Sequence, residues 1–116
     1  MNGEPILVVE DDRDIREAVA EVLEMEGYRT VVSTNGQEAL ERLHHMERPC
    51  LILLDVMMPV MDGYAFMARL QHEAPLADIP VVITSASHQP PAGARACVNK
   101  PFDLGHLLAV VKQFCG

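Results

Sequence analysis

Asp55 stands at the end of the apolar run Leu51–Leu54, which has Pro49 before it and Pro59 and Gly63 after it. An apolar run of this length, bounded by turn-forming residues, is typical of a buried strand. A carboxylate at the end of such a strand costs free energy unless it is paired, bound to a metal or reactive. Taken alone, Asp55 is more simply explained as a cap for the following turn, because aspartate is common in turns. Its chemistry therefore depends on the groups that the fold brings to it.

Other polar groups follow apolar runs in the same way. They are Glu10 and Asp11 after Ile6–Val9, Thr84 at the end of residues 79–84, and Lys100 after residues 96–99. If these groups converge, two carboxylates about 4 Å apart repel by roughly 4 kcal/mol at an effective dielectric of about 20, so they need compensating positive charge. Ligands that are all oxygen, with room for water, favour Mg²⁺, and the Lys100 ammonium would add to the compensation.

Strand and helix patterns alternate along the chain. This alternation would bring the polar groups together, because the strands of a parallel sheet all end at the same edge. Strands are expected at residues 6–9, 28–32, 51–54 and 79–84, which are rich in aliphatic or β-branched residues, and a weak fifth strand is expected at residues 96–99. Helices are expected from Asp12 or Asp14 to Gly27 and over residues 39–46 and 63–75. A last helix is expected to begin after Asp103 and to carry Leu104, Leu107, Leu108 and Val111 on one face. The alternation predicts an α/β fold, a parallel sheet with helices on both faces and with active groups at the carboxyl ends of its strands.

The connection between the last two expected strands is short. Only eleven residues, from Ser85 to Arg95, are available, and Pro90, Pro91 and Gly93 are among them. A helical crossover usually takes a dozen residues or more. The fourth helix is therefore expected to be short or missing.

Length and composition limit the classes of protein that this chain fits. Its 116 residues, 49% of them hydrophobic, suit a single domain over residues 1–116. No apolar run approaches the roughly 20 residues of a membrane span, and the amino terminus lacks the pattern of a secretory signal, so a cytoplasmic protein is expected. Seventeen acidic and nine basic residues give a net charge of -8, which argues against direct nucleic-acid binding.

Three cysteines, Cys50, Cys97 and Cys115, are an odd number and lack the spacing of metal ligands. Such a pattern indicates neither a disulfide framework nor a zinc site. We therefore expect buried or incidental thiols.

Four short motifs of the sequence occur in order, each at the end of an expected strand, and together they form a highly specific pattern. They are Val9-Glu10-Asp11, Asp55 with residues 58–63 (Met-Pro-Val-Met-Asp-Gly), Thr84-Ser85, and Lys100-Pro101-Phe102. In this order they resemble the receiver domain of two-component response regulators over essentially the whole chain. The resemblance implies a flavodoxin-like (βα)5 fold, doubly wound, with five parallel strands in the order 2-1-3-4-5.

The resemblance also implies a role for each matching residue. Asp55 would be the phosphoacceptor, taking a phosphoryl group from a sensor histidine kinase or a phosphotransfer protein. Asp11 would bind Mg²⁺ directly and Glu10 through water, with Asp55 and the backbone carbonyl of Met57 as further ligands. Thr84 and Lys100 would bind phosphoryl oxygens, which suits a reaction governed by positioning and by neutralisation of oxygen charge. Phosphorylation would then switch the binding of an unknown protein target, as a monomer or a phosphorylation-dependent dimer, and the domain is not expected to be an enzyme.

The sequence departs from the family at some positions. Cys97 occupies the site of a common aromatic residue on the fifth strand, which puts the usual relay from Thr84 in doubt. Met57 and Ala86 cannot orient a water molecule, so slow self-dephosphorylation is expected. The family also implies a cis Lys100–Pro101 peptide. Since no output domain follows Gly116 in this sequence, either a stand-alone receiver or one cut from a longer protein is expected.

Three rival functions differ in what they require. A receiver-like protein-interaction module that is not phosphorylated would have no need to keep Asp55, Thr84 and Lys100 together. A flavodoxin-like nucleotide binder would need a glycine- or hydroxyl-rich loop after its first strand, where this chain has acidic residues. A Mg²⁺-dependent phosphohydrolase would usually place a second acid two residues after its nucleophile, where this chain has Met57.

Overall fold

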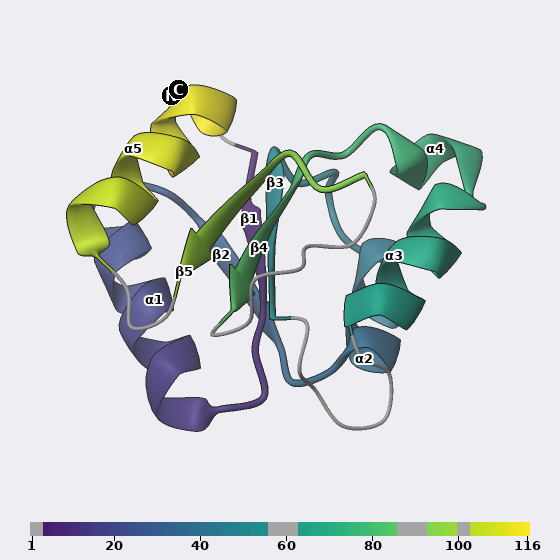
Figure 1. Cartoon of the computed structure of the whole chain (residues 1–116), viewed down its shortest axis with the longest axis horizontal. Helices are drawn as coiled ribbons and strands as arrows, with labels where there is room; N and C mark the ends of the chain where they lie inside the picture. The colour runs from purple at the N-terminus through teal and green to yellow at the C-terminus, as the bar shows by residue number, and fades with distance from the viewer. Residues whose placement is uncertain (1–3, 56–62, 86–92, 100–102) are drawn as a thin grey trace.

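The computed structural model describes residues 4–55, 63–85, 93–99 and 103–116. In these ranges strands and helices alternate along the chain (Figure 1). The strands are β1 (Ile6–Val9), β2 (Thr30–Ser33), β3 (Leu51–Asp55), β4 (Val81–Ser85) and β5 (Ala96–Asn99). The helices are α1 (Arg13–Met25), α2 (Gly36–Leu43), α3 (Gly63–Gln71), the short α4 (Ala74–Ala77) and α5 (Leu104–Cys115).

All five strands form one parallel sheet in the order β2-β1-β3-β4-β5. Strand β1 lies at the point where the order reverses, with β2 on one side and β3 on the other. The register aligns Val9 with Leu54, and Asp55 with Thr84. The predicted fold, a doubly wound parallel sheet with strand order 2-1-3-4-5, is therefore confirmed.

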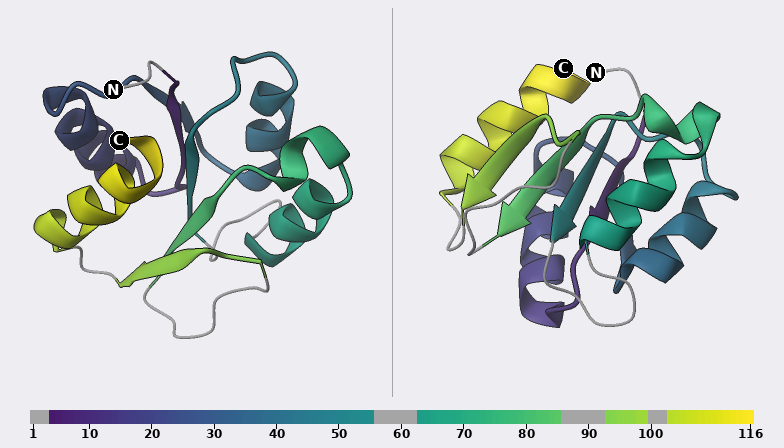
Figure 2. Two further views of the ribbon diagram at one scale, coloured as in Figure 1. Left: turned by 90° about the horizontal axis from the view of Figure 1, so that it is seen from above. Right: turned by 45° about the vertical axis from the view of Figure 1, so that its right-hand side comes forward.

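The two faces of the sheet carry separate hydrophobic clusters, because neighbouring residues in a strand point to opposite faces. Leu7 and Leu54 belong to the cluster under α2, α3 and α4, which includes the fully buried Phe66. Val8 and Leu53 belong to the cluster under α1 and α5. Both layers of helices are visible in Figures 1 and 2. Each fully buried Leu, Ile or Phe side chain contributes about 1.5–3 kcal/mol to the free energy of folding. The residues of β1 and β3 are buried, so these two strands supply much of that stabilisation.

Polar side chains fix where three helices begin. The Asp12 carboxylate accepts hydrogen bonds from the backbone N–H groups of Asp14 (2.9 Å) and Ile15 (3.2 Å) at the start of α1. Asn35 caps α2 and Asp103 caps α5 in the same way. A side-chain acceptor satisfies an N–H group that has no partner in the first turn of a helix. Of the two residues predicted as alternative caps of the first helix, Asp12 and Asp14, the structure has Asp12 as the cap, and the predicted cap at Asp103 is confirmed.

Some element boundaries differ from the predicted ones. Helix α2 ends at Leu43 rather than near Met46, and the third predicted helix is divided into α3 and α4, which carries Pro75 in its first turn. Proline is accepted at that place because its missing N–H would have no helical partner there. Leu104, predicted to lie on the apolar face of α5, is 47% exposed because it is the first residue of the helix.

The connection between β4 and β5 is described only in part. Residues 93–95 are not helical, whereas residues 86–92, where a short fourth crossover helix could lie, are outside the described residues. The predicted shortening or loss of that helix therefore stays a prediction. In the part of the chain that the structure describes, no helix is both long enough and apolar enough to cross a membrane.

A disulfide joins Cys50, just before β3, to Cys115, at the end of α5. The two Cα atoms are 5.5 Å apart although the residues are 65 positions apart in sequence. The prediction that these residues are unpaired thiols is wrong. Sequence spacing does not show this pair, because the packing of α5 against the sheet brings the two cysteines together.

Ser33, the last residue of β2, has a fully buried hydroxyl group with no hydrogen-bond partner among the described residues. A buried polar group without a partner costs about 1–3 kcal/mol. We therefore expect Ser33→Ala to raise the free energy of unfolding by about 1 kcal/mol. Urea denaturation of both proteins measures this change, and a less stable variant would contradict the explanation.

Candidate metal centre

Three carboxylates meet at the carboxyl ends of the two central strands. Glu10 and Asp11 follow β1, and Asp55 is the last residue of the neighbouring β3. One oxygen atom from each residue lies within 4.8 Å of the other two. Glu10 and Asp55 are 3% and 4% exposed, whereas Asp11 is exposed to solvent. The predicted convergence of these three residues is confirmed, and it leaves one side of the cluster open to water.

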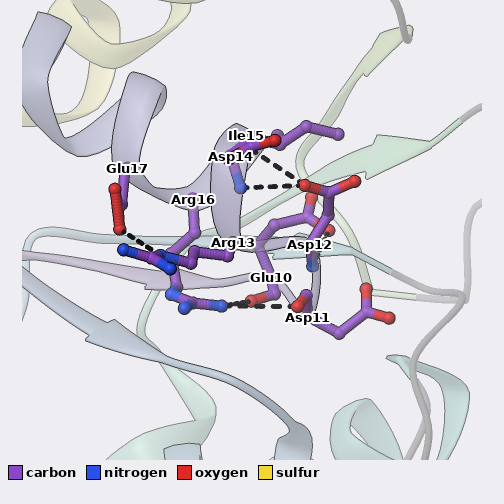
Figure 3. Close-up of polar contacts among 8 residues, drawn as sticks. All are labelled: Glu10, Asp11, Asp12, Arg13, Asp14, Ile15, Arg16 and Glu17. Carbon is purple, nitrogen blue, oxygen red and sulfur yellow. Dashed lines mark hydrogen bonds and ion pairs between the residues drawn. The ribbon is translucent and has the colours of Figure 1, made fainter.

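Backbone and side-chain hydrogen bonds fix the acidic turn, Glu10–Asp12, that joins β1 to α1 (Figure 3). The Glu10 N–H donates to the Ser33 carbonyl oxygen (3.0 Å), which extends the pairing of β1 with β2 by one residue. The Asp12 N–H donates to a Glu10 carboxylate oxygen (3.2 Å). The Glu10 side chain is therefore held by the turn to which it belongs.

The side chain of Arg16, one turn into α1, contacts the backbone carbonyl groups of the acidic turn (Figure 3). Its Nη1 atom donates to the carbonyl oxygen of Glu10 at 3.0 Å and lies 3.4 Å from that of Asp11. Sequence reasoning missed this residue. In the sequence Arg16 is simply an arginine one turn after a helix cap. Such residues are common, and the sequence alone does not indicate that this one contacts the backbone of the acidic turn.

Arg13 lies three residues earlier in the same helix and has a different partner. Its Nε atom is 2.9 Å from a Glu17 carboxylate oxygen, and both side chains are largely exposed. The hydrogen bond from Arg13, and then its charge, lower the pKa of the Glu17 carboxyl, and the same contact raises the pKa of Arg13. An exposed pair of this kind contributes little to stability. Arg13 is thus a nearby cation that is engaged outside the acidic turn.

The structure describes only some of the other predicted site residues. Thr84 is buried, with 5% exposure, and its Cα is paired with that of Asp55 across β3 and β4. Met57, Ala86, Lys100 and the Lys100–Pro101 peptide lie outside the described residues. Cys97 lies in β5, as predicted, and its Cα is paired with that of Ile83.

The donor set of this cluster fits a hard divalent cation. Among the described residues, the three donors of this group are all carboxylate oxygens, with no sulfur or imidazole donor beside them. Mg²⁺ prefers oxygen ligands and keeps several water molecules, which the exposed side at Asp11 can accommodate. A cation here would also offset the repulsion among three carboxylates, two of which are buried.

Comparisons with known proteins agree with this geometry. Residues 6–112 match the family model described as response regulator receiver domain. The chain is 35% identical to response regulator Rre1 of Synechocystis sp., over 96% of this chain and 52% of that protein. It is 34% identical to the phosphate regulon transcriptional regulatory protein PhoB of Pseudomonas aeruginosa, over 97% of this chain and 52% of that protein.

Solved structures show the same fold. The signal receiver domain of a signal transduction histidine kinase from Syntrophus aciditrophicus matches with a TM-score of 0.88 and 35% identity, covering 96% of this chain and 89% of that one. The chemotaxis protein CheY4 of Vibrio cholerae matches with a TM-score of 0.87 and 27% identity, covering 96% and 98% of the two chains. The chain spans about half the length of the curated relatives Rre1 and PhoB. Its sequence, its sheet and its acidic cluster together show that the chain belongs to the response regulator receiver domain family.

Proposed function

We propose that Asp55 accepts a phosphoryl group from a phosphohistidine of a sensor histidine kinase or a phosphotransfer protein. The observation that carries the proposal is the buried Asp55 carboxylate, which has oxygens of Glu10 and Asp11 within 4.8 Å and Thr84 beside it in the sheet. Three clustered carboxylates suit a site that binds a cation, and a bound cation would leave an oxygen of Asp55 placed to react with a phosphoryl group.

In the proposed reaction, an Asp55 carboxylate oxygen attacks the phosphorus atom. The new O–P bond forms as the P–N bond to the donor histidine breaks, and the bonding electron pair stays on the imidazole nitrogen, which takes up a proton. Phosphoryl transfer needs alignment and the neutralisation of oxygen charge more than it needs covalent help. When bound, Mg²⁺ would supply that neutralisation.

The residues of this chain would divide the work in a definite way. Asp11 would hold Mg²⁺ directly and Glu10 through water, while Asp55 and the backbone carbonyl of Met57 would complete the protein ligands. The Thr84 hydroxyl would donate to one phosphoryl oxygen. The Lys100 ammonium would pair with another, and its charge would favour the phosphorylated product.

We further propose that phosphorylation switches the binding of a downstream protein. The short connection between β4 and β5 leaves at most ten residues, 86–95, between these strands. The interaction surface would therefore lie on α1 or on the loop after Thr84, rather than on a full-length helix between β4 and β5. An interface mapped wholly to a long helix between β4 and β5 would contradict this part of the proposal.

Acetyl phosphate tests the proposed function without a partner kinase. With Mg²⁺, the chain is expected to gain one acyl phosphate that base or hydroxylamine removes, and tandem mass spectrometry after borohydride reduction is expected to locate it at Asp55. Chelation of the metal with EDTA is expected to abolish the labelling, because the carboxylates then repel the incoming phosphate. A chain that stays unlabelled with Mg²⁺ would instead favour the interaction module that is not phosphorylated.

A further inference from the structure

The backbone carbonyls of Glu10 and Asp11 belong to the two residues whose side chains face the candidate metal centre. Arg16 reaches both carbonyls through its Nη1 atom, at 3.0 Å and 3.4 Å. The side chain is partly buried against the turn and comes from α1, whose start is fixed by the Asp12 cap. One guanidinium on a rigid helix therefore holds two consecutive peptide groups.

These contacts complete the restraint of the acidic turn. On the strand side, the Glu10 N–H is bonded to the Ser33 carbonyl. On the helix side, the Asp12 N–H is bonded to the Glu10 carboxylate. Arg16 restrains the carbonyls between these two points, and so it sets the orientation of the peptide planes from which the Glu10 and Asp11 side chains project. A charged donor makes a stronger hydrogen bond to a carbonyl than a neutral donor does.

We propose that Arg16 is a positioning residue for the divalent cation. It acts through the backbone of the acidic turn and presents the carboxylates of Glu10 and Asp11 in the arrangement that binds metal. Partners of this kind, one step removed from the ligands, orient the ligands of many metal sites. The inference rests on the proposed function, because it assumes that the acidic cluster binds Mg²⁺.

The sign of the effect separates positioning from simple charge. A guanidinium close to a cation site repels the cation, so loss of its charge alone would strengthen Mg²⁺ binding. Loss of its positioning contacts would weaken Mg²⁺ binding instead. Replacement of a single residue therefore gives opposite results under the two explanations.

The experiment compares Arg16→Ala with Arg13→Ala as the matched control. Both variants remove one arginine from the first turns of α1, but Arg13 is bonded to Glu17 and not to the acidic turn. Isothermal titration with MgCl₂ is expected to show that Arg16→Ala weakens Mg²⁺ binding about tenfold, whereas Arg13→Ala does not weaken it. Arg16→Lys is expected to recover part of the affinity, because an ammonium can donate to a carbonyl but lacks the planar fork of guanidinium.

Hydrogen exchange in the metal-free chain provides a second readout. The Asp12 amide, which is bonded to the Glu10 carboxylate, is expected to exchange faster in Arg16→Ala and at the parent rate in Arg13→Ala. Tighter or unchanged Mg²⁺ binding by Arg16→Ala would overturn the proposal. If the parent chain itself binds no Mg²⁺, the proposed function fails, and an unchanged Asp12 exchange rate in Arg16→Ala would then overturn the positioning role as well.

Discussion

Asp55→Asn is expected to abolish phosphorylation by acetyl phosphate or by a phosphorylated kinase. The variant keeps the size and shape of the side chain, but an amide oxygen is a far weaker nucleophile than a carboxylate oxygen and cannot form the acyl phosphate. The substitution also replaces one of the three carboxylates of the cluster with a neutral amide, which would bind a cation more weakly. Mass spectrometry of the intact chain, before and after incubation with Mg²⁺ and acetyl phosphate, measures the loss.

Asp14→Asn is the matched control for this prediction. It makes the same chemical change at an exposed aspartate in the first turn of α1, outside the acidic cluster. It is expected to be labelled to the same extent as the parent chain. Labelling of Asp55→Asn at the parent level would show that another residue is the acceptor, and the proposed role of Asp55 would be wrong.

Loss of the Cys50–Cys115 disulfide is expected to lower the free energy of unfolding by about 4 kcal/mol. The bond closes a long loop, since the two residues are 65 positions apart, and it restricts the unfolded chain accordingly. A change of this size is a large part of the roughly 5–15 kcal/mol that stabilises most domains. Urea denaturation with and without dithiothreitol measures the effect.

Two variants serve as controls for the disulfide prediction. The double variant Cys50→Ser/Cys115→Ser is expected to be destabilised in both conditions and to be insensitive to dithiothreitol. Cys97→Ala changes the remaining cysteine and is expected to keep the full response to the reductant. Equal stability of the oxidised and reduced parent chain would show that the bond contributes nothing to the stability of the fold.

The sequence predicted those features that depend on local chemistry. The strand Ile6–Val9 and the cap of α1 are set by neighbouring residues. The strand lies where it was predicted, and the cap is Asp12, one of the two predicted candidates. The meeting of Glu10, Asp11 and Asp55 was also predictable, because the carboxyl ends of adjacent parallel strands lie at one edge of a sheet.

Features that depend on the packing of distant segments were not predictable in this way. The pairing of Cys50 with Cys115 requires the position of α5 relative to the start of β3, which sequence spacing does not encode. The contacts of Arg16 depend on the angle at which α1 leaves the sheet, because a small rotation would move the guanidinium away from both carbonyls. The roles of Met57 and Lys100 stay predictions, since these residues lie outside the described ranges.

The disulfide and the proposed phosphoacceptor lie at opposite ends of strand β3. Cys50 precedes its first residue and is bonded to α5, while Asp55 is its last residue. Five residue steps along a strand separate them by about 16 Å. A thiol reductant in the assay buffer would therefore cleave the disulfide without changing the carboxylates at the other end of β3. A phosphorylation rate measured in that buffer would be the rate of a less stable, reduced form of the protein.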